Sequence, residues 1–216
     1  MKYRALLFDL DGTLTDSGEG ITKSVQYALE KLGKPEPDLQ KLRIFVGPPL
    51  MEQFMSYASL TEEEGRQAVA YYRERYTPVG LYENKVYDGV PEMLRELKDR
   101  GYLLAVASSK PTVFVRKVLE HFDLLSCFDV VIGSEMDGRR TEKVEVIEAA
   151  LEELGMQDRR DEVMMIGDRM HDVEGARKAS LSCLAVSYGY GSMEELTAAG
   201  PAAIAASPAE VAAFFA

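Results

Sequence analysis

The chain of 216 residues is long enough for one ordinary domain, or for a core domain with a modest insertion. Apolar residues make up 46% and charged residues 28% of it, which is the usage of a globular protein and argues against a disordered, collagen-like or coiled-coil chain. The formal net charge of −11 comes without a basic cluster, so we do not expect polymer nucleic acid to be a partner.

The cellular location is predicted from two further features. Only a short apolar run follows the first four residues, unlike a secretory signal, and no apolar stretch approaches the ~20 residues that cross a bilayer. Cys127 and Cys183 stand in apolar surroundings without metal-ligand spacing, which favours buried thiols over a disulfide. We therefore expect a soluble, cytoplasmic protein with no membrane partner.

Short, almost wholly apolar runs recur along the chain and are typical of strands buried on both faces. They cover residues 5–8, 103–107, 130–132, 163–166 and 183–186. Apolar residues at helical spacing lie between them. Strand–helix–strand alternation of this kind predicts right-handed crossovers and an α/β fold with a doubly wound parallel sheet.

A long segment after the first strand breaks this alternation. It has no convincing buried strand and carries helical stripes instead, of which one is formed by Ile21, Val25, Ala28, Leu29 and Leu32. We predict a core domain of residues 1–15 and 83–216, with a helical cap, 16–82, inserted after strand 1. Such an insertion starts at the carboxyl ends of the strands, where open α/β sheets bind ligands. The Ala-rich tail, 198–216, is predicted to add a closing strand and helix.

Two carboxylates, Asp9 and Asp11, follow the first predicted strand, and Gly12 lets the backbone turn sharply there. If extended geometry persists, both side chains point the same way. Like charges this close are costly unless a cation or a shared proton compensates. A solvated Asp-Gly turn is the alternative interpretation.

A second acidic motif follows the predicted strand 163–166. Asp168 ends this strand, and Asp172 lies four residues later in what should be the first turn of a helix. Acids from two strands at one edge of a sheet form an oxygen-rich pocket that suits Mg²⁺. Asp172 could instead be no more than an acid favoured near a helix N-terminus, which would leave Asp168 unexplained.

Ser108 and Ser109 end the predicted strand 103–107, and Lys143 opens the predicted helix 143–154. A hydroxyl and free backbone N–H groups before a helix can hold a phosphoryl group, although Ser is also a common N-cap. A cation near a helix start is mildly unfavourable, so Lys143 is either a pocket residue or an ordinary solvated lysine.

In chain order, a DxDGT strand end, an insertion, a Ser strand end, a Lys and a GDxxxD strand end resemble the four motifs of the haloacid dehalogenase (HAD) superfamily of phosphohydrolases. The insertion resembles the C1 cap of its phosphoglycolate phosphatase-like branch. Segments 43–50, 137–138, 167–172 and 188–191 resemble the bacterial cluster called phosphoglycolate phosphatase-like or 5′-nucleotidase-like. Many relatives have Pro after the motif-three lysine, where this chain has Val144.

The resemblance implies roles for the acids. Asp9 would be the nucleophile that forms an aspartyl-phosphate, and Asp11 would protonate the leaving alcohol and then deprotonate the hydrolytic water. Mg²⁺ would be held by the Asp9 carboxylate, the Asp11 carbonyl and Asp168, with Asp172 as a direct or indirect ligand.

The resemblance also implies which residues hold the substrate. Ser108, the Ser109 backbone and Lys143 would bind the phosphoryl oxygens. Apart from the resemblance, the cap loop 43–50 is the candidate for contacting the leaving group, because Gly47, Pro48 and Pro49 favour a defined, non-helical turn. The Arg43 guanidinium either matches a second carboxylate or phosphate of the substrate or is an exposed cap arginine.

The expected function is Mg²⁺-dependent hydrolysis of a small phosphorylated metabolite, either phosphoglycolate-like or a nucleoside monophosphate, by a monomer or small homo-oligomer. Three alternatives stay open: a sugar-phosphate mutase, a phosphonatase with a cap lysine as Schiff base, and a non-catalytic phosphate-binding protein. Asp11 argues against a haloalkanoate dehalogenase, which lacks this second acid.

Overall fold

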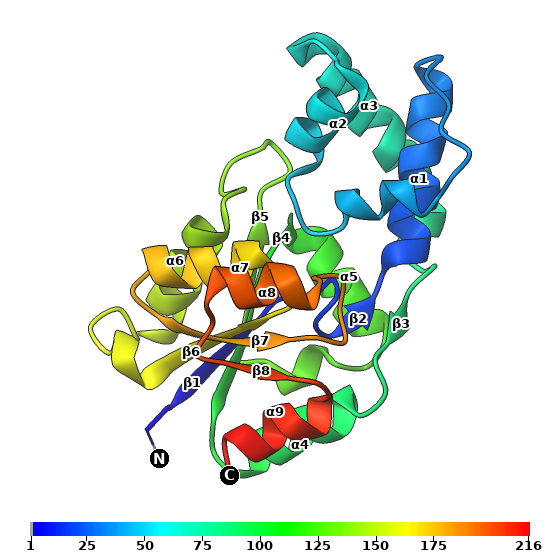
Figure 1. Ribbon diagram of the computed structural model, residues 1–216. Coiled ribbons are helices and arrows are strands. Elements are labelled where there is room, and N and C mark those ends of the chain that lie inside the picture. Colours follow the sequence, from blue (N-terminus) through cyan, green and yellow to red (C-terminus); the bar gives the residue numbers. More distant parts are fainter. Residues whose placement is uncertain (1) are drawn as a thin grey trace. The chain divides into compact units, whose positions relative to one another are not determined.

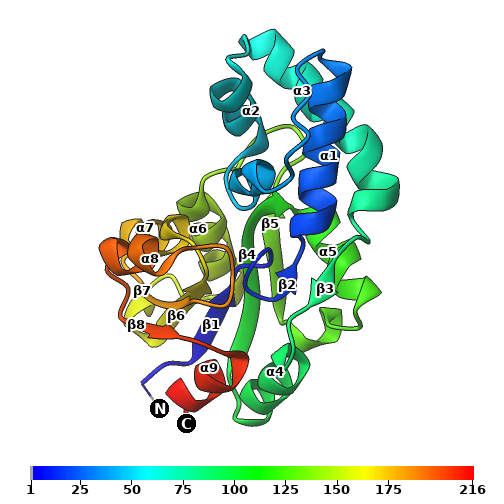
Figure 2. The ribbon, with the colours of Figure 1, turned by 45° about the vertical axis from the view of Figure 1, so that its right-hand side comes forward.

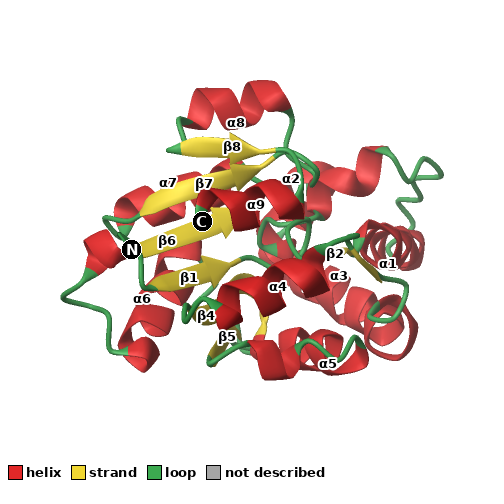
Figure 3. Cartoon of the chain, turned by 90° about the horizontal axis from the view of Figure 1, so that it is seen from below, coloured by secondary structure: helices red, strands yellow, loops and turns green. Residues whose placement is uncertain are grey.

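The computed structural model describes residues 2–216, which divide into two compact units, one formed by the chain up to Thr15 together with Val86–Ala216 and the other by Asp16–Lys85. The first unit is built on a six-stranded parallel sheet of order β5-β4-β1-β6-β7-β8 (Figure 3). Its strands are β1 (Ala5–Phe8), β4 (Leu103–Pro111), β5 (Val130–Ser134), β6 (Val163–Gly167), β7 (Ser182–Val186) and β8 (Ala203–Ala205). The predicted doubly wound α/β fold is therefore confirmed.

Strand β1 occupies the centre of the sheet. Ala5 pairs with Leu103 of β4 on one side and with Val163 of β6 on the other. All four β1 residues are fully buried, which is why the run carries no polar residue. The chain order reverses on either side of β1, so the ends of β1, β4 and β6 form the crevice in which such sheets bind ligands.

Helices cover both faces of the sheet (Figure 1). On one face lie α6 (Lys143–Leu154) and α7 (Met170–Lys178), with α8 (Met193–Ala199) packed beside α7. On the other lie α4 (Val90–Asp99), α5 (Thr112–His121) and α9 (Pro208–Phe214), together with the short turn η3 (Leu125–Cys127); the turn η4 (Arg160–Glu162) leads into β6. The predicted closing strand and helix are β8 and α9, and α8 precedes them.

Two expectations need correction. The strand predicted over 103–107 continues to Pro111, because an irregular stretch after Ala107 rejoins the ladder where Pro111 pairs with Ser134. Both cysteines are free thiols, but only Cys183 is buried, whereas Cys127 is partly exposed in the turn η3.

The second unit consists of α1 (Gly18–Lys31), η1 (Lys41–Phe45), α2 (Leu50–Ala58), α3 (Glu62–Arg75) and the π-helical turn η2 (Tyr76–Gly80) (Figure 2). Aromatic rings form its core, as in the pair Phe45 and Phe54, whose centroids lie 4.9 Å apart. Two short strands, β2 (Thr15–Asp16) and β3 (Lys85–Val86), pair where the chain passes between the units. Within residues 2–216, no helix is both long enough and apolar enough to cross a membrane.

The packing around β1 gives a first prediction. Leu7 is fully buried in the cluster between the sheet and helices α6 and α7, so Leu7→Ala should lower the free energy of unfolding by about 2–5 kcal/mol through the cavity it leaves. Leu103→Ala, at a side chain 37% exposed on neighbouring β4, is the matched control and should cost less than about 1 kcal/mol. Urea unfolding measures both; equal losses would contradict the proposed core.

Candidate functional site

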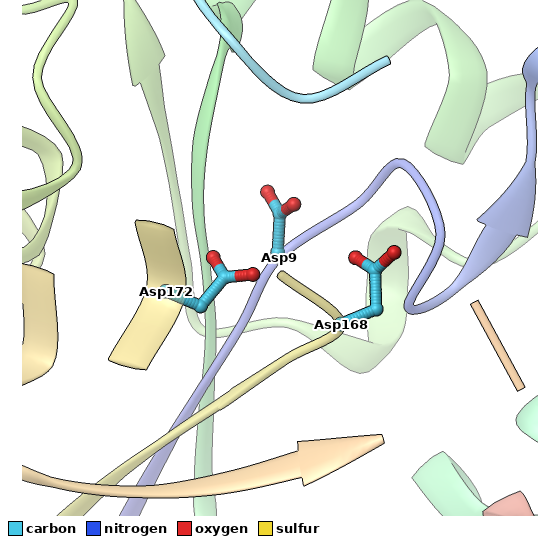
Figure 4. A group of neighbouring side chains, drawn as sticks. All are labelled: Asp9, Asp168 and Asp172. Atoms are coloured by element: carbon cyan, nitrogen blue, oxygen red, sulfur yellow. The ribbon is translucent and has the colours of Figure 1, made fainter. Parts of the chain in front are cut away.

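Three acids meet beyond the carboxyl ends of β1 and β6. Asp9 directly follows β1, Asp168 directly follows β6, and Asp172 lies in the first turn of α7. All three are buried, and one carboxylate oxygen from each lies within 4.8 Å of the others (Figure 4). The structure therefore brings both predicted acidic motifs into one cluster.

Asp168 and Asp172 are oriented by hydrogen bonds from neighbouring backbone and side chains. Thr13 Oγ1 donates to Asp168 Oδ1 at 3.2 Å, and the Tyr190 N–H donates to Asp168 Oδ2 at 2.8 Å. The Arg169 N–H donates to Asp172 Oδ2 at 3.0 Å, which places Asp172 in a capping interaction at the start of α7.

Glycines make room for these acids. Gly12 has a φ of +90°, and a Cβ built on it would overlap the carboxylate of Asp168. A Cβ on Gly167 would overlap the side chain of Asp172. One on Gly189 would overlap Asp168 and the Gly12 carbonyl. The Gly residues in the three motif segments are therefore explained by close approach to the acids.

Lys143 contacts two of the three acids. Its Nζ is 2.9 Å from Asp9 Oδ1 and 2.8 Å from Asp172 Oδ1, and it donates to the Ala107 carbonyl at 3.1 Å. The two carboxylate contacts have the distance of a hydrogen bond but not its angles, and they are therefore ion pairs. Lys143 is buried, which excludes the solvated-lysine interpretation.

Burial and mutual repulsion perturb the charges in this cluster. Burial raises the pKa of Asp168 well above its usual range, and the charges of Asp172 and Asp9 raise it further. Burial also raises the pKa of Asp172, against the opposing effect of Lys143. Burial alone would lower the pKa of Lys143, but the charges of Asp172 and Asp9 outweigh it and raise this pKa. The cluster thus holds more negative charge than one lysine balances.

Asp11 stands apart from the three clustered acids. Lys110 Nζ lies 2.8 Å from its Oδ1 and 2.6 Å from its Oδ2. Both side chains are less than a tenth exposed. The two acids of the first motif therefore contact different lysines.

Ser108 and Ser109 lie in the irregular stretch of β4. Ser108 is buried, and its Oγ accepts a hydrogen bond from the Lys110 N–H at 3.3 Å. The Ser109 carbonyl accepts a hydrogen bond from Ser134 Oγ at 2.8 Å. Lys143 donates to the carbonyl of Ala107, the residue just before this stretch, so its ammonium group lies next to Ser108 in the chain's fold.

The remaining candidate, Arg43, belongs to the second unit. It lies in η1, and its Nη1 donates to Gln40 Oε1 at 3.4 Å. A contact between Arg43 and a substrate stays a prediction.

Sequence reasoning missed several residues that support the site. The Lys110–Asp11 pair joins residues 99 positions apart, and no spacing rule connects them. Tyr188 Oη donates to the Thr13 carbonyl at 3.0 Å, and burial together with the charge of Asp168 raises the pKa of Tyr188. For Tyr188 a signal existed, because the segment 188–191 resembles the family although the resemblance gave its residues no role.

Residues 6–186 match the family model described as haloacid dehalogenase-like hydrolase. The chain belongs to this family. It is 49% identical to a 5′-nucleotidase of Pseudomonas aeruginosa over 93% of this chain and 90% of the relative. The crystal structure of a predicted phosphatase from Clostridium acetobutylicum superposes with a TM-score of 0.96, at 48% identity, over 100% of this chain and 99% of that one.

Other relatives of this HAD hydrolase differ in name. Tyrosine-protein kinase PtkA of Mycobacterium tuberculosis is 38% identical over 86% of this chain, which spans only 62% of PtkA. Proteins named phosphoglycolate phosphatase, from Colwellia psychrerythraea and Aliivibrio fischeri, are 28% and 27% identical. The resemblance to phosphatases of the HAD superfamily is thus confirmed, and the chain is an enzyme of that class.

The approach of α7 to Lys143 gives a second prediction. A Cβ on Gly175 would overlap the Cβ and Cγ of Lys143, which cannot swing away because the lysine is buried. Gly175→Ala should therefore lower the free energy of unfolding by about 1–3 kcal/mol, although Ala normally stabilises a helix interior by about 1 kcal/mol relative to Gly.

The matched control is Lys178→Ala, an exposed position on the same helix, which should change this free energy by less than about 0.5 kcal/mol. Urea unfolding compares the two variants. A stabilising effect of Gly175→Ala would mean that Lys143 does not pack against α7 as described.

Proposed function

We propose that this HAD hydrolase is a Mg²⁺-dependent phosphatase that hydrolyses a small phosphomonoester through an aspartyl-phosphate on Asp9. The observation that carries this proposal is the buried cluster of Asp9, Asp168 and Asp172 at the carboxyl ends of β1 and β6, with Lys143 paired to Asp9 and Asp172. The proposed nucleophile, Asp9, thus lies beside a cation and two potential metal ligands.

The chemistry of the donor set fits Mg²⁺. Three carboxylates supply hard oxygen ligands, and their oxygens converge within 4.8 Å. Burial, and after it the charges of neighbouring carboxylates, raises the pKa of Asp168 and of Asp172, and a bound cation would offset both effects by favouring the ionised form. Asp9, Asp168 and Asp172 would hold the ion, with the Asp11 carbonyl as the further ligand that the family resemblance implies. When bound, the ion would supply electrostatic neutralisation, so that an anionic carboxylate and an anionic phosphoryl group can approach.

The proposed reaction has two steps carried by this chain's residues. A carboxylate oxygen of Asp9 attacks phosphorus, the bond from phosphorus to the leaving oxygen breaks, and the leaving oxygen takes a proton from Asp11. In the second step, Asp11 removes a proton from water, which attacks the aspartyl-phosphate and restores the Asp9 carboxylate. Ser108 and Lys143 hold the phosphoryl oxygens through both steps.

The substrate proposed is a small phosphorylated metabolite. A nucleoside 5′-monophosphate is the first choice, because the relative named 5′-nucleotidase is far more similar to this chain than those named phosphoglycolate phosphatase. Arg43 is proposed to contact the leaving group. A panel of nucleoside monophosphates, phosphoglycolate and p-nitrophenyl phosphate, assayed with Mg²⁺ for released phosphate, tests this choice directly.

The nucleophile gives a third prediction. Asp9→Asn should reduce phosphate release more than about 1,000-fold, because an amide is too weak a nucleophile to form the acyl-phosphate. Its fold should be retained by circular dichroism, and Asp99→Asn, an exposed acid at the end of α4, is the control that should keep full activity. Turnover by pure Asp9→Asn protein near the wild-type rate would exclude the proposed mechanism.

Metal dependence gives a fourth prediction. Chelation should abolish turnover and Mg²⁺ should restore it. Mg²⁺ should also raise the melting temperature of the protein, because the ion binds only the folded carboxylate cluster. The Asp168→Asn variant should lose most of this thermal shift, while the Asp99→Asn control should keep it. Full turnover in excess chelator, with the metal content checked, would refute the metal site.

A further inference from the structure

The ion pair between Lys110 and Asp11 is not used by the reaction described above. Each oxygen of the Asp11 carboxylate lies within hydrogen-bond distance of the Lys110 ammonium, at 2.8 and 2.6 Å. The side chains are 7% and 9% exposed, so little water competes for either group. Lys143, in contrast, contacts Asp9 and Asp172 but not Asp11. The two halves of the first acidic motif therefore have separate cationic partners.

The backbone around Lys110 is shaped to present this side chain. The ladder between β4 and β5 is regular up to Ala107, shifts register, and resumes at Pro111. The Lys110 N–H donates to Ser108 Oγ within the irregular stretch. On the other side, a Cβ on Gly133 would overlap the Lys110 carbonyl, so β5 allows the stretch to bulge against it.

Hydrogen bonds between β5 and the start of α5 hold the same stretch in place. The Gly133 N–H donates to Thr112 Oγ1 at 3.0 Å, and this hydroxyl donates to the Ser134 carbonyl at 3.3 Å. Ser134 Oγ in turn donates to the Ser109 carbonyl. The residues on both sides of Lys110 are therefore anchored, which limits where its ammonium can lie.

A buried ion pair is a poor device for stability, because both charges lose their hydration. A more exposed lysine satisfies a carboxylate at lower cost, as Lys98 of α4 does for Asp129 before β5, with distances of 2.8 and 2.9 Å and side chains 34% and 33% exposed. The buried pair instead restricts the carboxyl group of Asp11 to one orientation. Orientation is what a group that transfers protons within an active site requires.

The geometry points to Lys110 as the positioning residue of Asp11, an inference that rests on the proposed function. Lys110 holds the Asp11 carboxyl group in place for proton transfer to the leaving oxygen. When one Asp11 oxygen carries the proton, the other still accepts a hydrogen bond from the ammonium, so the orientation persists. As the phosphorus–oxygen bond breaks, its electron pair stays on the leaving oxygen, and the proton passes from Asp11 to that oxygen.

Leaving-group dependence separates this role from a structural one. A nucleoside monophosphate releases a basic alkoxide that needs a proton, whereas p-nitrophenyl phosphate releases a stable phenolate that does not. In single-turnover experiments, which report the first step alone, Lys110→Met should lower the rate of leaving-group release about 10- to 100-fold for the nucleotide and less than about 3-fold for p-nitrophenyl phosphate, with the Kd of the nucleotide nearly unchanged. Hydrolysis of the aspartyl-phosphate, in which Asp11 also acts, is common to both substrates and does not enter this rate. Lys110→Arg keeps a cation and should recover most of the difference. Lys98→Met removes the exposed counterpart and should change neither rate.

Coupling to Asp11 is the second arm of the test. In an Asp11→Asn background, adding Lys110→Met should lower nucleotide turnover by less than about 2-fold relative to Asp11→Asn alone, because the group that Lys110 positions is already lost. If Lys110→Met does not fold, as judged by thermal melting, Lys110→Gln takes its place in the same comparison of the two substrates.

Three results would overturn the inference. Equal proportional losses of the single-turnover rate on both substrates would assign Lys110 a purely structural role. A rise in Kd confined to the nucleotide would make Lys110 a substrate-binding residue. Full additivity of Lys110→Met with Asp11→Asn would show that the two act independently. Turnover by Asp9→Asn would instead overturn the proposed function, and the role of Lys110 with it.

Discussion

The repulsion among three buried carboxylates is the constraint on which the site depends. Asp9, Asp168 and Asp172 converge because parallel strands β1 and β6 end at the same edge of the sheet. Lys143 offsets part of this repulsion, and its ion pairs to Asp9 and Asp172 account for the position of a buried lysine at the start of α6, where the helix dipole disfavours a cation. The pairing of β1 with β6 in the sheet therefore holds these acids together against their mutual repulsion.

The surrounding structure is arranged to bring backbone and acids together. Gly12, Gly167 and Gly189 lack the side chains that would overlap Asp168 or Asp172, and Gly175 leaves space for the stem of Lys143. Gly12 follows β1, whereas Gly167, Gly175 and Gly189 come from β6, α7 and the loop after β7. A side chain at Gly12, Gly167 or Gly189 would therefore reach the acids by steric contact, and one at Gly175 would reach Lys143.

The elements whose residues are defined by burial could be predicted from the sequence. Features that depend on contacts with residues far away in the chain could not. The run 5–8 is wholly apolar because both faces of β1 are covered, so β1 was found with its exact bounds, and so was helix 143–154. Lys143 and the clustered acids could be singled out because they stand at strand or helix ends, and Ser108 because the apolar run of β4 ends just before it. The continuation of β4 to Pro111 and the pairing of Lys110 with Asp11 depend on contacts with β5 and β1 that local patterns do not encode.

The charge balance links the two lysines to the proposed chemistry. When ionised, Asp9, Asp11, Asp168 and Asp172 share the two ammonium groups of Lys110 and Lys143, which leaves two negative charges uncompensated. A pocket in that state repels a phosphomonoester dianion, whereas one divalent cation makes it neutral. Two further lysines would reach the same balance, but an ammonium group offers no open ligand position to the phosphoryl group. Under the proposed function, this excess of acid over base is the charge that a bound Mg²⁺ would balance while leaving a ligand position open for the phosphoryl group.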